Sequence, residues 1–419
     1  MRIIYATLAA SAALAAPLAA QDRAAVLKTY ADIGQAGYED AHATAVKLRE
    51  AVKTLIASPS AETLQAAKEA WLHARVPYQQ TEVFRFGNAI VDDWEGKVNS
   101  WPLDEGMIDY VDPAYGGATD ENPLAVLNVI ANEKLMIGGQ EVDATVITPE
   151  LLEGSLQEAG AIETNVATGY HAIEFLLWGQ DLNGTGPGNG ARPWTDYASG
   201  DACTGGNCDR RGAYLTAVTD LLTSDLAWMA EQWGAEGEAR KTVESDENAG
   251  ITAILTGMGS LSYGELAGER MRLGLMLNDP EEEHDCFSDN TYNSHYYDGM
   301  GIRNVYLGQY VGIDGRVVEG ASVSDLVAAA DPAVDTDLKA ALNTTMMRLG
   351  ELKTVAESGM AYDQMLAADN AVGGAVIQRA VDALVAQTKD IERAVGALKL
   401  DQIAFEGSDS LDNPSAVFQ

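Results

Sequence analysis

The sequence predicts an all-α fold. Apolar residues recur at helical spacing through long segments, and no stretch shows the sustained apolar–polar alternation that is typical of a strand. Stretches rich in Gly, Pro and Asn separate these segments, as expected for loops between helices. With 419 residues, the chain is long enough for two domains or for one large two-lobed unit.

The first 20 residues have the pattern of a secretory signal peptide. One Arg is followed by an apolar run and then by small residues that end at Ala20, where we expect cleavage. No later apolar run approaches the length of a membrane span. We therefore expect an exported protein whose mature chain, residues 21–419, has no transmembrane segment.

The net charge and the cysteines indicate which ligands and which disulfide to expect. The net charge of -36 argues against a nucleic-acid partner, because an acidic surface repels phosphates, and it favours cations; solubility alone also accounts for most of this charge. Cys203 and Cys208 lie close together in the flexible loop C-T-G-G-N-C, where we expect a disulfide, which leaves Cys286 free.

Periodicity and helix breakers place the elements of the first half. The first helix ends at Ser58-Pro59-Ser60, and Thr148-Pro149 is a typical helix start, with a capping residue before Pro in the first turn. The predicted elements are helices at 22–57, from 61 with a kink at Pro77, at 122–136 and at 163–178, and one helical turn at 104–110 within an ordered loop.

The second half repeats the helical pattern after a long loop at 181–210. The loop contains D-L-N-G-T-G, but its twelfth position is Arg192, where a calcium loop needs a bidentate Glu, so we reject that interpretation. It also lacks the ending of a phosphate-binding loop. The predicted helices are 210–234, 248–277, 294–312, 333–357 and 371–400.

The main candidate site is the segment G-Y-H-A-I-E-F-L-L-W-G, residues 169–179. His171 and Glu174 are three residues apart, so they project from one helical face and their polar atoms can converge on one point. Apolar residues surround them, and a buried His or Glu needs a partner. The two residues are either a structural pair in the core or part of a functional site.

Charged residues on other helices are candidates for the same site. The second helix carries a stripe that mixes aromatic and charged side chains, and its charges must pair either with one another or with a cavity shared with His171. In the second half, Glu265 and Glu269 are four residues apart, with Arg270 beside them. The stripe of the second helix consists of Trp71, Arg75, Tyr78, Glu82 and Arg85.

Four segments together resemble the imelysin family of exported bacterial proteins, in particular its iron-regulated protein A branch. His-x-x-Glu alone is a weak signal, but its appearance with three further segments in this order is strong, and the resemblance spans nearly the whole mature chain. The segments are G-Y-H-A-I-E at 169–174, W-L-H-A-R-V-P-Y-Q-Q-T-E-V-F-R-F at 71–86, W-P-L-D-E at 101–105, and E-L-A-G-E-R-M with E-H-D-C-F-S-D-N-T between 265 and 291.

The resemblance implies two related helix bundles packed side by side, about 21–180 and about 208–405, with a site in the cleft between them. It also implies a periplasmic location, or a peripheral one at the outer membrane or cell surface. A link to iron or other metal uptake makes a membrane-bound uptake system a candidate partner. The residues that match the family's polar positions are His171, Glu174, Glu82, Arg75, Asp104, Glu269 and Arg270.

We favour a metal ion as the ligand, with iron first and zinc or calcium as alternatives. The family is classed among metallopeptidases, but both common zinc-peptidase signatures, His-Glu-x-x-His and His-x-x-Glu-His, are absent. With five His in the chain, the ligand set would be rich in carboxylates, which suits iron, manganese or calcium better than catalytic zinc. The expected ligands are His171, Glu174, Glu82 and Glu269, supported by Arg75, Asp104 and Arg270.

Three other hypotheses stay open. The chain could be a metallopeptidase that uses His171 and Glu174. Two Glu-x-x-His pairs, Glu39 with His42 and Glu281 with His284, could build a di-iron centre, although such pairs arise easily by chance in so acidic a chain. A binding module without a metal could instead hold a peptide, a polysaccharide or a partner protein in an aromatic cleft, lined by Trp71, Tyr78, Trp94, Trp101, Tyr110 and Trp194.

Overall fold

The computed structural model describes residues 23–418, so the predicted signal peptide lies outside the described residues. Regular structure within this range is overwhelmingly helical, which confirms the predicted all-α class. The exceptions are two short antiparallel hairpins, Lys134–Ile137 (β1) with Gln140–Asp143 (β2), and Gln309–Val311 (β3) with Val317–Glu319 (β4). None of the helices in 23–418 combines the length and hydrophobicity needed to cross a bilayer.

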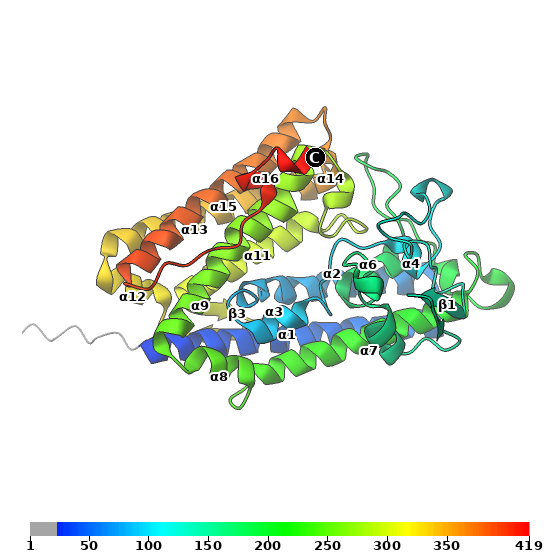
Figure 1. Ribbon diagram of the computed structural model, residues 1–419, viewed down its shortest axis with the longest axis horizontal. Coiled ribbons are helices and arrows are strands. Elements are labelled where there is room, and N and C mark those ends of the chain that lie inside the picture. The colour runs from blue at the N-terminus through cyan, green and yellow to red at the C-terminus, as the bar shows by residue number, and fades with distance from the viewer. Residues whose placement is uncertain (1–22, 419) are drawn as a thin grey trace, which may run out of the picture.

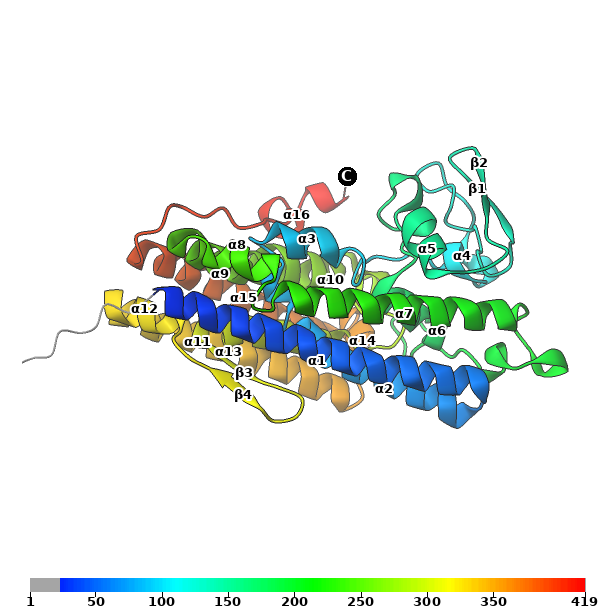
Figure 2. The same ribbon diagram turned by 90° about the horizontal axis from the view of Figure 1, so that it is seen from below.

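The first bundle is built around the long helix α1. This helix packs along α2 on one side and along α7 on the other, and α6 packs against both α2 and α7 (Figures 1 and 2). Helix α7 begins at residue 208, where the sequence places the start of the second bundle, yet it lies beside α1. The four helices are α1 (Arg23–Ala57), α2 (Ala61–Gln79), α6 (Gly169–Trp178) and α7 (Cys208–Gln232).

The second bundle lies at an angle to the first and consists mainly of the chain after residue 247 (Figure 1). Helix α15 packs along α13 and along the π-helical segment η7, while α11 packs on α13 and also reaches α2 of the first bundle. Its elements are α9 (Glu247–Ser260), η7 (Leu261–Leu273), α10 (Gly274–Leu277), α11 (Thr291–Leu307), α12 (Val323–Ala330), α13 (Pro332–Glu357), α14 (Tyr362–Leu366) and α15 (Ala371–Ala397).

Each bundle has buried apolar contacts of its own. One large core fills the first bundle and extends into the junction, with Trp71 and Trp233 fully buried in it. A smaller core joins η7 to α13, α14 and α15. Short helices complete the description: α3 (Ala89–Glu95), α4 (Glu105–Ile108), α5 (Pro149–Leu151), α8 (Glu238–Glu244) and α16 (Asp409–Asp412).

The predicted helix at 122–136 is wrong, because its backbone bonds to another segment. The N–H groups of Asn128, Val129 and Ile130 donate to the carbonyl oxygens of residues 106–108, at 2.9 to 3.1 Å, rather than to the preceding turn. Asn128 also has a left-handed backbone, with φ of 44°. The segment therefore satisfies the carbonyls at the end of α4 and continues into β1.

A glycine fixes where α6 begins. Gly169 has φ of +80°, and a side chain there would place its Cβ 2.4 Å from the carbonyl oxygen of Val98. The next residue, Tyr170, donates its N–H to that same oxygen at 2.7 Å. Only glycine fits so close an approach, and this start places His171 in the first turn of the helix. The helix spans 169–178 rather than the predicted 163–178.

Candidate metal centre

His171 and Glu174 face one another in the first turns of α6, as their spacing predicts. Nδ1 of His171 lies 3.1 Å from Oε2 of Glu174. The other carboxylate oxygen, Oε1, accepts hydrogen bonds from the N–H (3.0 Å) and the hydroxyl (2.6 Å) of Ser288. Both residues are buried, with 1% and 0% of their surface exposed. Glu174 therefore fixes the imidazole and leaves the opposite nitrogen, Nε2, without a hydrogen-bond partner.

The loop before α11 brings His284 and Asp285 to the same place. The ring centroids of His284 and His171 are 4.8 Å apart and the rings are nearly perpendicular; the Trp101 ring centroid lies 5.7 Å from that of His284. One ligand atom each from His171, His284 and Asp285 lie within 4.8 Å of one another, the only such group of three among residues 23–418. This set, together with Glu174, is hereafter the His171 cluster.

Asp285 is held by a buried network. Its Oδ1 is 2.8 Å from Nη2 of Arg75, and its Oδ2 accepts hydrogen bonds from Asn290 and Ser294. Arg75 also donates to Oδ1 of Asn99 at 2.6 Å. The guanidinium thus holds the carboxylate beside the two imidazoles.

Burial sets the protonation of the cluster. It lowers the pKa of His171 to about 3, helped by the nearby charge of Arg75, and it lowers the pKa of His284 well below its ordinary value. Burial also raises the pKa of Glu174, as does the charge of Asp285. For Asp285 itself, burial acts to raise the pKa, but the charge of Arg75 together with the hydrogen bonds from Ser294 and Asn290 lowers the pKa below its ordinary value. Both imidazoles are therefore neutral, the form that binds metals.

Glu82 and Arg270 belong to a second buried cluster, the Arg270 cluster. Arg270 forms ion pairs with Glu82 (2.8 Å), Glu265 (2.7 Å) and Asp298 (3.3 Å). The π-helical winding of η7 explains the partner choice, because it brings residues five apart onto one face, so Glu265 meets Arg270. Glu269 is turned away to a surface hollow beside Ser408.

The remaining predicted residues have other roles in the structure. Asp104 precedes α4 and accepts hydrogen bonds from Tyr115, Asn122 and Thr164, which ties two loops together. Cys203 and Cys208 form a disulfide with an S–S distance of 2.01 Å, and Cys286 is a free thiol. Glu39 and His42 lie on α1, and no described contact links them to the His171 cluster.

Sequence reasoning missed His284 and Asp285 as partners of His171. His284 was considered only with Glu281, at a spacing that presupposes a helix, but the chain at 283–290 is not helical. A signal was present in E-H-D-C-F-S-D-N-T, which places two potential ligands side by side. Residues 284–289 form turns, and the approach of both side chains to α6 is a tertiary contact that local sequence does not reveal.

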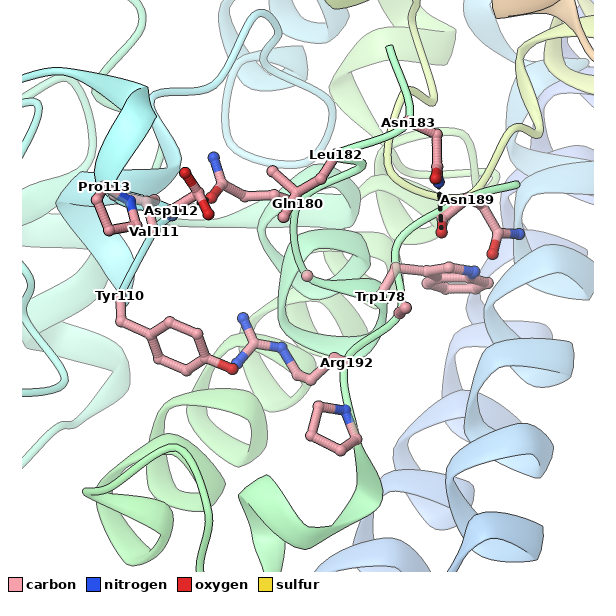
Figure 3. A pocket seen from close by; sticks show the side chains of 13 residues that line it. Tyr110, Val111, Asp112, Pro113, Trp178, Gln180, Leu182, Asn183, Asn189 and Arg192 are labelled. Atoms are coloured by element: carbon pink, nitrogen blue, oxygen red, sulfur yellow. Dashed lines mark hydrogen bonds between the residues drawn. The ribbon is translucent and has the colours of Figure 1, made fainter. Parts of the chain in front are cut away.

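A separate pocket opens at the other end of α6, with a volume of about 400 Å³ (Figure 3). Tyr110 and Arg192 point toward one another across one side, with the guanidinium carbon 5.2 Å from the ring centre. Trp178 and the side-chain amides of Gln180 and Asn189 line the rest. The pocket combines an aromatic surface with hydrogen-bonding groups, and it shares no lining residue with the His171 cluster.

The fold and the cluster define an all-α protein of two helix bundles, with two histidines and a carboxylate buried where the bundles meet. The imelysin family model matches residues 34–391, most of the chain. The chain therefore belongs to the imelysin family.

Individual relatives agree with this assignment. Iron-regulated protein A of Synechococcus elongatus is 39% identical over 67 residues, a match that spans 16% of this chain and only 19% of that protein. A crystal structure described as a proposed iron-regulated protein A precursor from Parabacteroides distasonis covers 92% of this chain and 97% of its own, with a TM-score of 0.64 and 19% identity. An imelysin-like protein from Psychrobacter arcticum covers 91% and 98%, with a TM-score of 0.55 and 17% identity. The two structures support the fold.

Proposed function

We propose that this imelysin-family chain is an exported metal-binding protein that serves iron or other metal acquisition, with iron as the first candidate. In this proposal His171, His284 and Asp285 bind the ion, and Glu174 and Arg75 hold two of these ligands in place. The relative from Synechococcus is named for iron regulation, which agrees with this choice.

One observation carries the proposal: two buried imidazole nitrogens beside a carboxylate have no hydrogen-bond partner. They are Nε2 of His171 and Nδ1 of His284. A buried polar atom without a partner is destabilising by about 1–3 kcal/mol, so such atoms are rare unless they have a purpose. A cation bound between the two rings and Asp285 would satisfy both nitrogens.

The surrounding contacts also fit a metal. Metal-binding histidines commonly direct their second nitrogen toward a carboxylate, and Glu174 occupies that position for His171. Two imidazoles and one carboxylate suit Fe²⁺ and Zn²⁺, whereas Ca²⁺ prefers a set made of oxygens. The proposed ligand set therefore differs from the one expected from the sequence: Glu174 supports His171, and Glu82 and Glu269 are not ligands.

Metal content of the purified protein tests the proposal. Wild type, His171→Ala and a control, His73→Ala, are exposed equally to iron, zinc, manganese and calcium, desalted, and measured by elemental mass spectrometry. His73 is exposed on α2 and lies outside the cluster. We expect one ion per chain in wild type and control, and none in His171→Ala. Equal metal retention by all three proteins would refute the proposal.

A peptidase would need a metal that a peptide can reach. The three proposed ligands are only 0–1% exposed, so the described arrangement offers no room for a peptide at the ion. We therefore favour metal binding over peptide hydrolysis as the function of this site. Degradation of casein by the zinc-loaded protein, stopped by a chelator and absent in His171→Ala, would reverse this order.

The pocket at the end of α6 supports a second candidate, binding of a small organic ligand or a sugar. Its aromatic and amide side chains are the groups that recognise such molecules. Calorimetry with short oligosaccharides and peptides tests it, with Trp178→Ala as the variant. Loss of binding in that variant, with metal content unchanged, would assign a function to the pocket that is independent of the His171 cluster.

A further inference from the structure

A small hollow is lined by residues that flank two of the proposed metal ligands in the chain. Its walls include Asp181, Glu281, Glu283 and Cys286. Glu283 and Cys286 immediately flank His284 and Asp285 in the chain. The hollow and the two ligands are therefore built from one continuous segment of the chain.

The carboxylates around this hollow are unusual for surface charge. Glu283 is only 1% exposed, and its Oε2 has no hydrogen-bond partner. Asp363, in the first turn of α14, is also 1% exposed. Acidic residues that serve solubility are exposed, whereas burying a carboxylate without a partner is unfavourable. Solubility therefore does not explain these two positions.

Five carboxylates influence one another here, and no Lys, Arg or His of residues 23–418 forms an ion pair with them. Burial, together with the charges of Asp363 and Asp181, raises the pKa of Asp289 to about 7. Burial and Asp181 likewise raise the pKa of Asp363 to about 6. The group, here the acidic mouth, consists of Asp181, Glu281, Glu283, Asp289 and Asp363.

The spacing of the carboxylates in the acidic mouth indicates that they attract a hydrated cation rather than bind a bare one. Among the described residues, only His171, His284 and Asp285 bring three ligand atoms within 4.8 Å, so the carboxylates of the mouth are too widely spaced to replace the water shell of an ion. Small divalent cations lose their water reluctantly, and carboxylates can attract the hydrated ion through its field.

We propose that the acidic mouth is the access route by which a hydrated divalent cation reaches the His171 cluster. The inference rests on the proposed metal function and adds the path of the ion and the residues that set its rate of capture. Clefts lined by charge of one sign raise association rates about 10-fold to 1000-fold, an effect that salt weakens.

Stopped-flow binding of Co²⁺ at pH 8 tests the route, because Co²⁺ quenches tryptophan fluorescence and Trp101 lies beside His284. The mouth variant combines Glu281→Gln, Asp289→Asn and Asp363→Asn. Its matched control combines Glu133→Gln, Glu231→Gln and Glu392→Gln, three exposed acids on other elements, so both carry the same net charge.

We expect the association rate at about 20 mM salt to fall at least about fivefold in the mouth variant and to depend less on salt, with the control close to wild type. Equal rates in the two variants would overturn the access route while leaving the metal site standing. If His171→Ala gave the same Co²⁺ quenching as wild type, the proposed function and the route would both be overturned.

Discussion

The two buried polar clusters at the junction of the bundles are built from similar residues but differ in how their atoms are satisfied. In the Arg270 cluster, one guanidinium faces three carboxylates at 2.7 to 3.3 Å. In the His171 cluster, the single guanidinium of Arg75 has one carboxylate partner, and two neutral imidazoles keep unpartnered nitrogens.

In the proposed function, this difference separates a structural role from a binding role. Ion pairs link segments, and those of the Arg270 cluster join η1 (Glu82–Phe84) of the first half to η7 and α11 of the second. Neutral imidazole nitrogens that lie beside a carboxylate and lack a hydrogen-bond partner can bind a cation through a lone pair. The following predictions test whether this comparison holds, from the largest expected effect to the smallest.

The Arg270 cluster should matter most for stability. Arg270→Ala leaves Glu82 and Asp298 buried without a positive partner, so we expect the free energy of unfolding to fall by about 3–5 kcal/mol. Urea unfolding of the metal-free protein at pH 7 measures this loss. Arg272→Ala is the control, since Arg272 lies on the same segment and contacts only Gln378 among the hydrogen bonds described. Equal losses would show that the cluster has no special role.

The His171 cluster should matter most for the metal. His284→Ala removes a ligand, so we expect iron or zinc affinity to fall by more than the 10–100-fold that is typical for loss of an outer partner. Competition with a chromophoric chelator measures the affinity. Unchanged affinity with unchanged unfolding would mean that the two imidazoles are a packed pair and that the comparison fails.

Glu174 should act through His171 rather than on the metal. We expect Glu174→Gln to weaken metal affinity by about 10–100-fold, because the amide orients the imidazole less firmly. Glu269→Gln should leave the affinity unchanged, since Glu269 lies at a surface hollow. The same chelator competition compares the two variants. A loss in Glu269→Gln would restore the ligand set expected from the sequence.

The smallest expected effect is the pH dependence of folding stability that comes from Glu95, a buried carboxyl near the Arg270 cluster. Burial raises the pKa of Glu95 from 4.5 to about 7. The folded state therefore holds this proton more tightly than the unfolded state, so its stabilisation is present below about pH 4.5 and is lost as pH rises through about 7.

Replacing this carboxyl should remove that pH dependence. We expect Glu95→Gln to be more stable than wild type by about 1–3 kcal/mol at pH 8 and to differ little at pH 4.5. Thermal unfolding between these pH values gives the comparison, with Glu231→Gln as an exposed control. A parallel pH profile for Glu95→Gln and wild type would contradict the assignment of Glu95.

Helix positions were largely predictable because they depend on local sequence. The first helix was expected at 22–57 and spans 23–57, and the one expected at 333–357 spans 332–357, since periodicity and caps act within a few residues. The error at 122–136 arose because three backbone N–H groups bond to the carbonyls of residues 106–108, a contact that no local pattern announces.

The same division applies to the site. The sequence by itself determined that His171 and Glu174 share a helical face, because the helical repeat alone places residues three apart together. Only the tertiary structure decided that His284 and Asp285 join them, and that Glu82 pairs with Arg270. Those partners are separated by more than a hundred residues, and their meeting depends on how two bundles pack and on the π-helical winding of η7, which moves Arg270 onto the face of Glu265. Local periodicity carries no information about either.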